Sequence, residues 1–359
     1  MVYGIILAGG KGERFWPLSR TDMPKQFLRL TSEKMMLEET IERILPLVPK
    51  ENVRVVTGEN MVGVIRNEIP GLPEQCILSE PLGRNTCVAI GLAATHLARI
   101  DPHAVLIVLS SDHLIRPTDK LLKILEEGAA VASEGEHLIT IGIVPTRPET
   151  GYGYIKIGDK FEHAGSHPIF RVAGFAEKPR VAVAKEYYFS GDFLWNSGMF
   201  IWSAAAILKA IAECQPELSK LFVEYAGQIG TNSEAEARRQ LYRKAISISV
   251  DFAVLEKAAN VLTMKADIVW DDVGGWTALE RYMDRDADNN VRVGETAILD
   301  SYEMTVYNDA QGIIACLGVS DLIVVRSGDI TMVLHKSRAD EIKKMLTVLE
   351  ENEKTRKYL

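Results

Sequence analysis

The first 145 residues alternate between short apolar runs and longer stretches with helical spacing. The run Val2–Ala8 has the length of a buried strand and ends at two glycines. In the longer stretches, apolar residues recur every three or four positions, as in an amphipathic helix. Such alternation predicts a parallel sheet with helices on both faces. The predicted strands are Val2–Ala8, Val53–Thr57, Ala104–Leu109 and Leu138–Val144, and the predicted helices are Leu37–Val48, Asn85–Ile100 and Leu121–Ala132.

The pattern changes after residue 145. Two strand-like runs, Gly151–Ile157 and Ile169–Glu177, follow each other with little helix between them. Lys178-Pro179 starts a helical stretch that reaches Tyr188, and the aromatic-rich run Phe193–Trp202 is expected to form another strand. We expect Trp195, Phe200 and Trp202 to lie in the core, and a platform for a sugar is the alternative. Residues 204–242 are mostly helical. We interpret residues 146–288 as a second lobe that shares one edge of the same sheet.

The C-terminal residues form a third pattern. Short β-like runs recur from Asn289 onward, and a charged helix covers residues 338–352. The runs are Thr296–Leu299, Met304–Tyr307, Ile313–Cys316, Leu322–Val325 and Thr331–Leu334. The sequence therefore predicts an α/β fold: a Rossmann-like mixed sheet with helices on both faces over residues 1–288, divided at residue 145, and a small β-rich module over residues 289–359.

Composition excludes several classes of protein. The chain has 359 residues, 47% of them hydrophobic and 25% charged, as in soluble globular proteins. Its net charge of −8 argues against broad binding to nucleic acid or to anionic membranes. There is no apolar run of about 18 residues to span a membrane and no signal-peptide pattern. The four scattered cysteines contain no CxxC pair, which favours reduced thiols and a cytoplasmic location.

The loop that follows the first strand is rich in glycine and in positive charge. Residues 11–29 carry five cations against Glu13 and Asp22. Glycines after a strand let backbone N–H groups converge on an anion at the carboxyl edge of a sheet. The loop does not match a Walker A sequence. It also departs from the Gly-x-Gly-x-x-Gly pattern of dinucleotide-binding loops, because Phe15 occupies the position of the third glycine. Either Lys11, Arg14 and Lys25 direct their charge at a triphosphate, or the loop is a flexible turn with solvated charges.

Seven motifs carry a resemblance to a known family. The loop reads Leu7-Ala-Gly-Gly-x-Gly-x-Arg14 and continues with FWPLSR and PKQF. The other six follow in order as EPLGRNT (residues 80–86), SSDH (110–113), TGYGYI (150–155), FAEKP (175–179), WNSGMF (195–200) and WDDVGGW (270–276). Together they resemble the sugar-1-phosphate nucleotidylyltransferases, and in particular the mannose-1-phosphate guanylyltransferases. The resemblance covers about residues 1–285 and implies the nucleotide-diphospho-sugar transferase type of fold.

The reaction implied by the resemblance joins GTP and mannose 1-phosphate into GDP-mannose and pyrophosphate. A phosphate oxygen of the sugar phosphate attacks the α-phosphorus, and pyrophosphate leaves. A sugar phosphate is largely a dianion at neutral pH, so its attack needs no general base. The protein has to neutralise and align two polyanions. This requirement agrees with the absence of an evident Ser/His/Asp or Cys/His pattern.

The resemblance also implies a metal site and a set of phosphate-binding cations. It places Asp112 and Asp272 at one Mg²⁺, which takes carboxylate oxygens together with phosphates and waters. Asp112 is alternatively a helix N-cap or turn residue, and Asp271 competes with Asp272 as the ligand. Arg14 and Lys25, with Asp112, are the predicted catalytic residues, and solvated surface cations are the alternative for the basic ones. The loop residues predicted to bind the nucleotide are Leu7, Ala8, Gly9, Gly10, Lys11 and Gly12.

The base and the sugar phosphate are assigned to two further groups of residues. Glu80, Asn85 and Thr86 lie in the segment that the family uses around the base, and a carboxylate facing the guanine donors would reject adenine. Asn85 is alternatively a helix cap. For the sugar phosphate the candidates are Gly151, Glu177, Lys178 and Asn196; an ordinary surface ion pair is the alternative for Glu177 and Lys178.

Other functions remain open at this level. One alternative is a nucleotidylyltransferase for another hexose 1-phosphate or another NTP, and a second is a non-catalytic nucleotide-sugar sensor with the same fold. Longer family members carry an added isomerase domain; since this sequence ends at Leu359, we expect no isomerase activity. By resemblance, the β-rich tail and the last helix are candidate surfaces for a homodimer.

Overall fold

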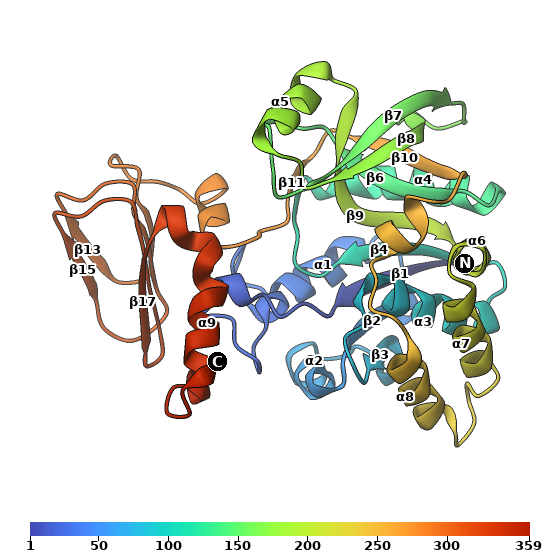
Figure 1. The fold of residues 1–359 in the computed structure, drawn as a ribbon, viewed down its shortest axis with the longest axis horizontal. Helices are drawn as coiled ribbons and strands as arrows, with labels where there is room; N and C mark the ends of the chain where they lie inside the picture. Colours follow the sequence, from blue (N-terminus) through green and yellow to red (C-terminus); the bar gives the residue numbers. More distant parts are fainter. The chain divides into compact units, whose positions relative to one another are not determined.

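The computed structural model describes residues 1–359 and groups them into two compact units that are interleaved along the chain. The glycine-rich loop near the N-terminus belongs to the same unit as the C-terminal residues, as the blue and red segments of Figure 1 illustrate. Unit 1 comprises Met1–Gly9, Glu38–Ser111 and Ile115–Trp270, and unit 2 comprises Gly10–Leu37, Asp112–Leu114 and Asp271–Leu359. The domain limits predicted at residues 145 and 288 stay predictions.

Unit 1 is built on a nine-stranded mixed sheet with the order β3-β2-β1-β4-β9-β6-β10-β8-β7. Strands β1 to β4 are parallel to one another, as are β6 and β10, whereas β7, β8 and β9 pair antiparallel with their neighbours. The strands are β1 Val2–Ala8, β2 Val53–Gly58, β3 Ile77–Glu80, β4 Val105–Ser110, β6 Leu138–Ile143, β7 Gly153–Phe161, β8 Ile169–Glu177, β9 Phe193–Ser203 and β10 Val261–Ala266.

The position of β9 corrects the prediction that the second lobe shares only one edge of the sheet. Strands β8 and β7 end the strand order, and β7 also pairs with the first residues of β9. Strand β9 itself lies in the interior, between β4 and β6. Its residues Phe200, Ile201 and Trp202 are all buried, so both of its faces are covered, as in a central strand. An aromatic run of this kind predicts a strand but not its place in the sheet.

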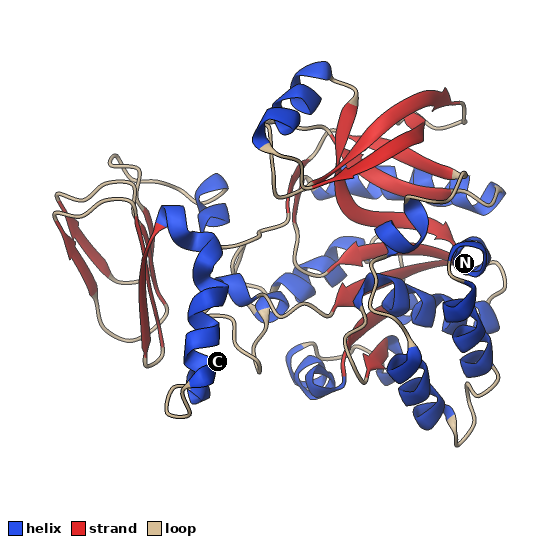
Figure 2. Ribbon diagram, viewed as in Figure 1, coloured by secondary structure: helices blue, strands red, loops and turns tan.

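Helices cover both faces of the sheet, which confirms the predicted fold class (Figure 2). On one face, Phe200 and Trp202 pack in a core formed with α3, α6, α7 and α8. On the other face, Gly128 of α4 lies so close to Ile201 that a Cβ at residue 128 would be 2.5 Å from its side chain. Side chains alternate between the faces of a strand, so α3 and α4 lie on opposite sides. These helices are α3 Asn85–Ile100, α4 Thr118–Glu134, α6 Ala204–Cys214, α7 Pro216–Ala226 and α8 Glu234–Lys244.

The remaining elements of unit 1 are short. A π-helical turn, Asp251–Leu255, lies between α8 and β10. Strands β5 and β11 form a two-stranded sheet of their own, where the chain passes from one unit to the other. Their bounds, with those of the remaining helices, are β5 Leu114–Arg116, β11 Val269–Asp271, α1 Met36–Ile44, α2 Val62–Glu68 and α5 Val181–Ser190.

The C-terminal part of unit 2 is a module of short strands in which alternate strands along the chain pair in parallel. Strands β12, β14 and β16 pair in parallel, β17 closes that sheet antiparallel, and β13 pairs in parallel with β15. One corner needs glycine: Gly294 has φ +75°, and a Cβ there would be 2.0 Å from the Asn308 carbonyl oxygen. The strands are β12 Val291–Val293, β13 Thr296–Leu299, β14 Thr305–Asn308, β15 Ile314–Leu317, β16 Leu322–Ser327 and β17 Ile330–His335, and helix α9 Ile342–Glu351 follows.

The N-terminal loop packs into the core of this unit. Phe15 is fully buried and contacts Trp276 at a ring-centroid distance of 5.3 Å. The Trp16 indole donates to the carbonyl of Tyr358, 2.8 Å away, near the C-terminus. Burying large aromatic side chains is strongly favourable, so these contacts fix the shape of the charged loop. The shared core contains Phe15, Trp16, Leu18, Leu28, Leu30, Met36, Leu114, Val273, Trp276, Ala278, Leu279, Ile323, Val325, Ile330, Met332 and Ile342.

Two predictions based on composition can be compared with the structure. The four cysteines are all free, as predicted. None of the helices has both the length and the apolar character needed to cross a membrane.

Candidate active site

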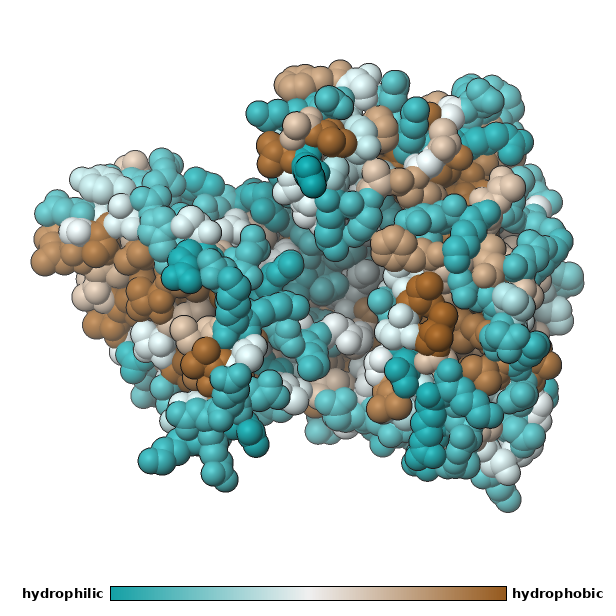
Figure 3. Space-filling model, in the orientation of Figure 1, coloured by the Kyte–Doolittle hydropathy of each residue, from teal (hydrophilic) through white to brown (hydrophobic).

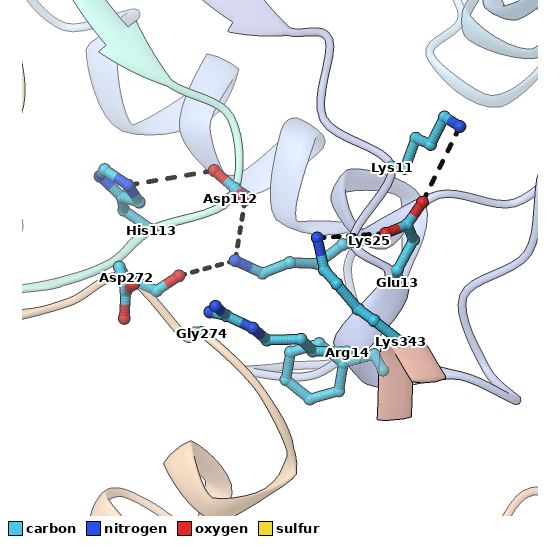
Figure 4. A pocket seen from close by; sticks show the side chains of 11 residues that line it. Lys11, Glu13, Arg14, Lys25, Asp112, His113, Asp272, Gly274 and Lys343 are labelled. Atoms are coloured by element: carbon cyan, nitrogen blue, oxygen red, sulfur yellow. Dashed lines mark hydrogen bonds and ion pairs between the residues drawn. The ribbon is translucent and has the colours of Figure 1, made fainter. Parts of the chain in front are cut away.

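A pocket in unit 2 collects the predicted phosphate-binding and metal-binding residues (Figure 4). Its volume is about 570 Å³, within the usual range for a small-molecule site. The glycine-rich loop provides one side of the pocket, and the segments around Asp112 and Asp272 provide the other. The lining residues are Lys11, Gly12, Glu13, Arg14, Phe15, Lys25, Asp112, His113, Asp272, Gly274 and Lys343.

Close contact between two parts of the loop sets its shape. Gly12 has φ +63°, and a Cβ at this residue would be 2.1 Å from the Cβ of Lys25. Only glycine accommodates both the left-handed backbone and this approach. The Gly12 carbonyl accepts hydrogen bonds from the Ser19 hydroxyl at 2.7 Å and from the Phe15 N–H at 2.9 Å. Two short 3-10 helices, Glu13–Phe15 and Lys25–Phe27, complete the loop.

Lys25 joins the two predicted metal-binding segments. Its ammonium donates to the Asp112 carboxylate at 2.8 Å and to the Asp272 carbonyl at 2.6 Å. Lys25 is only 5% exposed, so it is not one of the solvated surface cations of the alternative interpretation. A buried ammonium needs such partners to offset the loss of hydration. The cation therefore lies at the junction of three chain segments that are far apart in the sequence.

The surroundings of Asp112 keep its carboxylate ionised. Burial alone would raise the pKa of Asp112, but the Lys25 ammonium and the His113 ring outweigh burial and hold that pKa below its ordinary value. His113 Nε2 lies 4.0 Å from the second carboxylate oxygen. Asp112 faces the pocket and does not start a helix, because α4 begins only at Thr118.

The two adjacent aspartates of the WDDVGG motif differ in their surroundings. Asp271 is 5% exposed and is held by the Arg281 guanidinium and by the N–H of Val273. Asp272 lines the pocket instead. Asp271 is thus engaged in a structural ion pair with Arg281, and of the two aspartates it is Asp272 that faces the pocket.

The rest of the pocket wall is strongly charged. Arg14 and Lys11 come from the loop, and Lys11 is well exposed, with its ammonium 3.8 Å from Glu13. Glu13 also pairs with Lys343 of helix α9 at 3.2 Å. The sequence-based prediction did not include Glu13, His113 or Lys343. His113 and Glu13 lie inside the quoted motifs, whereas nothing in the sequence around Lys343 connects it to the site.

The residues proposed for the base lie in unit 1. Glu80, at the end of β3, is 7% exposed, and its Oε1 accepts a hydrogen bond of 3.0 Å from the Tyr242 hydroxyl. Its Oε2 lies toward Gly9, because a Cβ at Gly9 would be 3.4 Å from that oxygen. Burial raises the pKa of Glu80 to about 7, although the Tyr242 hydrogen bond opposes the change.

Asn85 and Thr86 make local contacts at the start of α3. The Asn85 side chain accepts from the Thr86 N–H at 2.7 Å, while Asn85 itself has φ +67°. This bond reaches only the next residue, and the N-cap position of α3 is Arg84, with no side-chain cap hydrogen bond. The capping alternative for Asn85 is therefore not confirmed. The Thr86 hydroxyl accepts from the N–H of Val250 at 2.9 Å. Leu7 and Ala8 are the last residues of strand β1. The Leu7 carbonyl accepts a hydrogen bond from the Ser111 N–H, and the Ala8 carbonyl accepts one from the Thr57 hydroxyl.

The residues proposed for the sugar phosphate also lie in unit 1. Gly153 pairs with Glu177 across β7 and β8, and a Cβ at Gly153 would be 2.6 Å from Glu177 Oε2 and 3.4 Å from the Cβ of Asn196. Asn196 donates to the Asp251 carboxylate at 2.8 Å. The segment at Val250 and Asp251 thus connects the base candidates with the sugar candidates. The pKa of Asp251 is raised by burial, against the effect of the Asn196 bond.

Other predicted residues of this group have simpler surroundings. Lys178 lies 3.0 Å from Glu177, and both side chains are exposed; this is the surface ion pair of the alternative interpretation, worth little by itself. The N–H of Gly151 donates to Glu149 at 3.0 Å. Trp195, like Phe200 and Trp202, is buried, which confirms that these aromatic side chains belong to the core.

The structure thus divides the predicted site residues into three groups. The pocket of unit 2 is lined by Lys11, Gly12, Arg14, Lys25, Asp112 and Asp272 of the predicted phosphate and metal residues, but not by Leu7, Ala8, Gly9 or Gly10. The base and sugar groups lie in unit 1, together with Tyr242 and Asp251, which the sequence-based prediction missed. Neither residue stands in one of the seven motifs, so no local signal identifies them.

Comparisons with known proteins assign the chain to a class. The family model described as nucleotidyl transferase matches residues 3–289, and a second, described as a MannoseP isomerase/GMP-like beta-helix domain, matches residues 294–349. The chain therefore belongs to the nucleotidyl transferase family.

Individual relatives narrow the class. The mannose-1-phosphate guanylyltransferase of Escherichia coli is 35% identical over 358 residues, which cover 99% of this chain and 75% of the relative. The xanthan biosynthesis protein XanB of Xanthomonas campestris pv. campestris (strain B100) is 36% identical over 349 residues, or 96% of this chain and 73% of the relative. A crystal structure from Thermus thermophilus, described as a mannose-1-phosphate geranyltransferase, has a TM-score of 0.86 at 36% identity and covers 97% of this chain and 99% of that one. Within its family the chain groups with the mannose-1-phosphate guanylyltransferases, which confirms the resemblance found in the motifs.

Proposed function

We propose that this protein transfers GMP from GTP to mannose 1-phosphate and releases pyrophosphate. The observation that carries the proposal is the pocket in which Arg14, Lys25, Asp112 and Asp272 meet around the glycine-rich loop. A site with this balance of cations and carboxylates suits a polyphosphate and a divalent cation. Similarity to named guanylyltransferases over 99% of the chain supports the same activity.

The mechanism that we propose relies on charge and position. The phosphate dianion of the sugar is itself the nucleophile, so no side chain has to remove a proton. Arg14 and Lys25 bind the β- and γ-phosphates and stabilise the charge that develops on departing pyrophosphate. The backbone of residues 7–12, with Lys11, holds the triphosphate in line with the attacking oxygen.

The donor set of the pocket fits Mg²⁺. Mg²⁺ in proteins is commonly held by one or two carboxylates and completed by phosphates and waters. Asp112 and Asp272 both line this pocket and supply it with two carboxylates. We propose Asp112 and Asp272 as the ligands, because Asp271 is held by Arg281. The ion would neutralise phosphate charge at the reacting centre.

The specificity of the reaction is assigned to the residues of unit 1. We propose that Glu80 accepts hydrogen bonds from the N1–H and amino groups of guanine, with Asn85 and Thr86 beside the base. Gly151, Glu177 and Asn196 would bind the sugar through its hydroxyls, and Lys178 would pair with its phosphate. Asp251 holds the Asn196 amide in one orientation, which leaves the other N–H of that amide for a hydroxyl.

A substrate panel tests the proposal. Purified protein is given mannose 1-phosphate or glucose 1-phosphate with each NTP and Mg²⁺, and pyrophosphate release is measured. We expect GTP with mannose 1-phosphate to give the highest kcat/KM, and EDTA to stop the reaction until Mg²⁺ is restored. Faster release with another NTP or sugar would identify a different nucleotidylyltransferase. GDP-mannose binding in calorimetry, without release from any pair, would identify a sensor.

The affinity for GTP is expected to fall at acidic pH. Because the pKa of Glu80 is about 7, this carboxyl is mostly ionised at pH 8 and mostly protonated at pH 6. A protonated carboxyl loses acceptor capacity for the two guanine donors. We expect KM for GTP to rise roughly tenfold between pH 8 and pH 6, in line with the change in ionised fraction. Glu80→Gln should give a high KM with little dependence on pH; an unchanged KM in this variant would remove Glu80 from the base.

Thermal unfolding of the same variant checks the ionisation of Glu80 independently of the base. The pKa of Glu80 is raised above its ordinary value of 4.5, so ionisation opposes folding, and stability is lost as pH rises from about 4.5 to about 7. Glu80→Gln removes this loss and is expected to be more stable than the wild type at pH 8, by up to about 3 kcal/mol.

We further propose a homodimer and a cytoplasmic location. Figure 3 shows hydrophobic side chains on the C-terminal module, over β13 and β15. Leu299, Ile313 and Leu317 of this region are each more than half exposed, and such an apolar surface fits a partner copy. Sedimentation analysis of the full chain measures the oligomeric state. The free cysteines support a reducing compartment.

A further inference from the structure

Helix α9 brings one basic side chain into the phosphate pocket. Lys343, the second residue of that helix, lines the pocket together with the loop residues Lys11, Glu13 and Arg14. Its neighbour Lys344 instead pairs with Glu341 at 3.0 Å and does not line the pocket. The helix is held against the loop because Ile342 is buried in the core that contains Phe15 and Trp276. The position of Lys343 is thus fixed by packing.

The charge around Lys343 is arranged for an anion. Its ammonium lies 3.2 Å from the Glu13 carboxylate, which also faces Lys11 at 3.8 Å. The Glu13 carboxylate therefore pairs with two ammonium groups at the edge of the pocket. Arg14, the residue after Glu13 in the sequence, adds a third cation. The side chain of Lys343 is 60% exposed, so its pair with Glu13 is weak and can be exchanged for phosphate oxygens.

The side of the pocket identifies which phosphates Lys343 would meet. Figure 4 shows Lys343 with Glu13 and Lys11, on the loop side, whereas Asp112, His113 and Asp272 stand opposite. Asp112 and Asp272, on the carboxylate side, would hold the proposed metal, which would neutralise charge on the reacting phosphates. The loop side is left for the phosphates that depart.

We propose that Lys343 is a binding residue for the pyrophosphate moiety, contributed to the pocket by the C-terminal module. It binds the terminal phosphates of the bound triphosphate and of the pyrophosphate product, beside Arg14 and Lys25. In the free protein, Glu13 holds its ammonium at the pocket edge until a phosphate replaces that contact. This inference rests on the proposed function and extends it to a residue outside the N-terminal 288 residues.

The experiment compares Lys343→Gln with Lys344→Gln, which removes the same charge from the next position of the same helix. In the reverse reaction, with GDP-mannose and pyrophosphate, we expect Lys343→Gln to raise KM for pyrophosphate roughly three- to tenfold. KM for GDP-mannose should change less than twofold, and the effect should shrink with added NaCl because salt screens exposed charges. Lys343→Arg should restore most of the affinity, and Lys344→Gln should match the wild type.

Three results would overturn the inference. The first is an unchanged KM for pyrophosphate in Lys343→Gln. The second is an equal loss of affinity in the two glutamine variants, which would reduce the effect to the net charge of the helix. The third is a lower melting temperature with equal rises in both KM values, which would assign Lys343 to stability instead. If the wild type turns over no substrate, the proposed function fails, and calorimetric titration of pyrophosphate into wild type and Lys343→Gln still decides whether Lys343 binds it.

Discussion

Replacement of Asp112 by asparagine is expected to abolish turnover while the fold stays intact. The carboxylate faces the pocket, accepts a hydrogen bond from Lys25 at 2.8 Å and is held ionised by that cation. Asparagine keeps the size of the side chain but removes the charge that we assign to the metal. We expect kcat to fall on the order of 10³-fold, as when a group that stabilises developing charge is removed. Pyrophosphate release measures the loss, and circular dichroism and the melting temperature verify the fold.

The two neighbouring aspartates provide an internal comparison for this prediction. Asp272→Asn should behave like Asp112→Asn, because Asp272 lines the same pocket. Asp271→Asn should instead lower the free energy of unfolding by about 2 kcal/mol, because it breaks a largely buried ion pair with Arg281. If Asp112→Asn retains full activity, Asp112 does not bind the metal. If Asp271→Asn is inactive but stable, the two aspartates have the opposite roles.

Replacement of Gly12 by alanine is expected to cause the second large effect. The new Cβ would lie 2.1 Å from the Cβ of Lys25 and 2.9 Å from its backbone nitrogen, on a backbone with φ +63°. Neither the backbone nor the nearly buried Lys25 can yield without moving the loop. We expect a loss of stability of about 3 kcal/mol or more, and a loss of activity of at least roughly 100-fold, because an error of about 1 Å in position has that effect.

Gly10→Ala is the matched control for stability. No atom lies within 4 Å of a Cβ built at Gly10, so its melting temperature should equal that of the wild type. Unfolding of both variants is followed by calorimetry. A Gly12→Ala variant as stable as Gly10→Ala would show that the loop does not need the close approach at Lys25.

Much of the secondary structure could be predicted because each of these elements is determined by the residues within it and beside it in the sequence. The limits of β1, α3, β8 and β13 are those predicted, since apolar runs and turn residues define them. The place of β9 in the sheet could not be predicted in this way. It depends on pairing with β4 and β6, and no pattern within residues 193–203 encodes those partners.

The loop that contains Phe15 and Trp16 shows a different limit. Its glycines and cations predict an anion site. Its aromatic side chains also have to be buried, but the sequence does not indicate which residues bury them. They pack with Trp276 and with residues of β16 and β17. Likewise, two adjacent aspartates look equivalent in the sequence, and only the position of Arg281 separates Asp271 from Asp272.

The shared core of unit 2 has a consequence for protein synthesis. A ribosome makes the charged loop well before it makes β16, β17 and α9, whose side chains share a core with Phe15 and Trp16. The sheet of unit 1 can fold while the nascent chain grows. The loop cannot pack until these residues have been synthesised. A polypeptide released before then would expose Phe15 and Trp16 to solvent and would lack an assembled phosphate pocket.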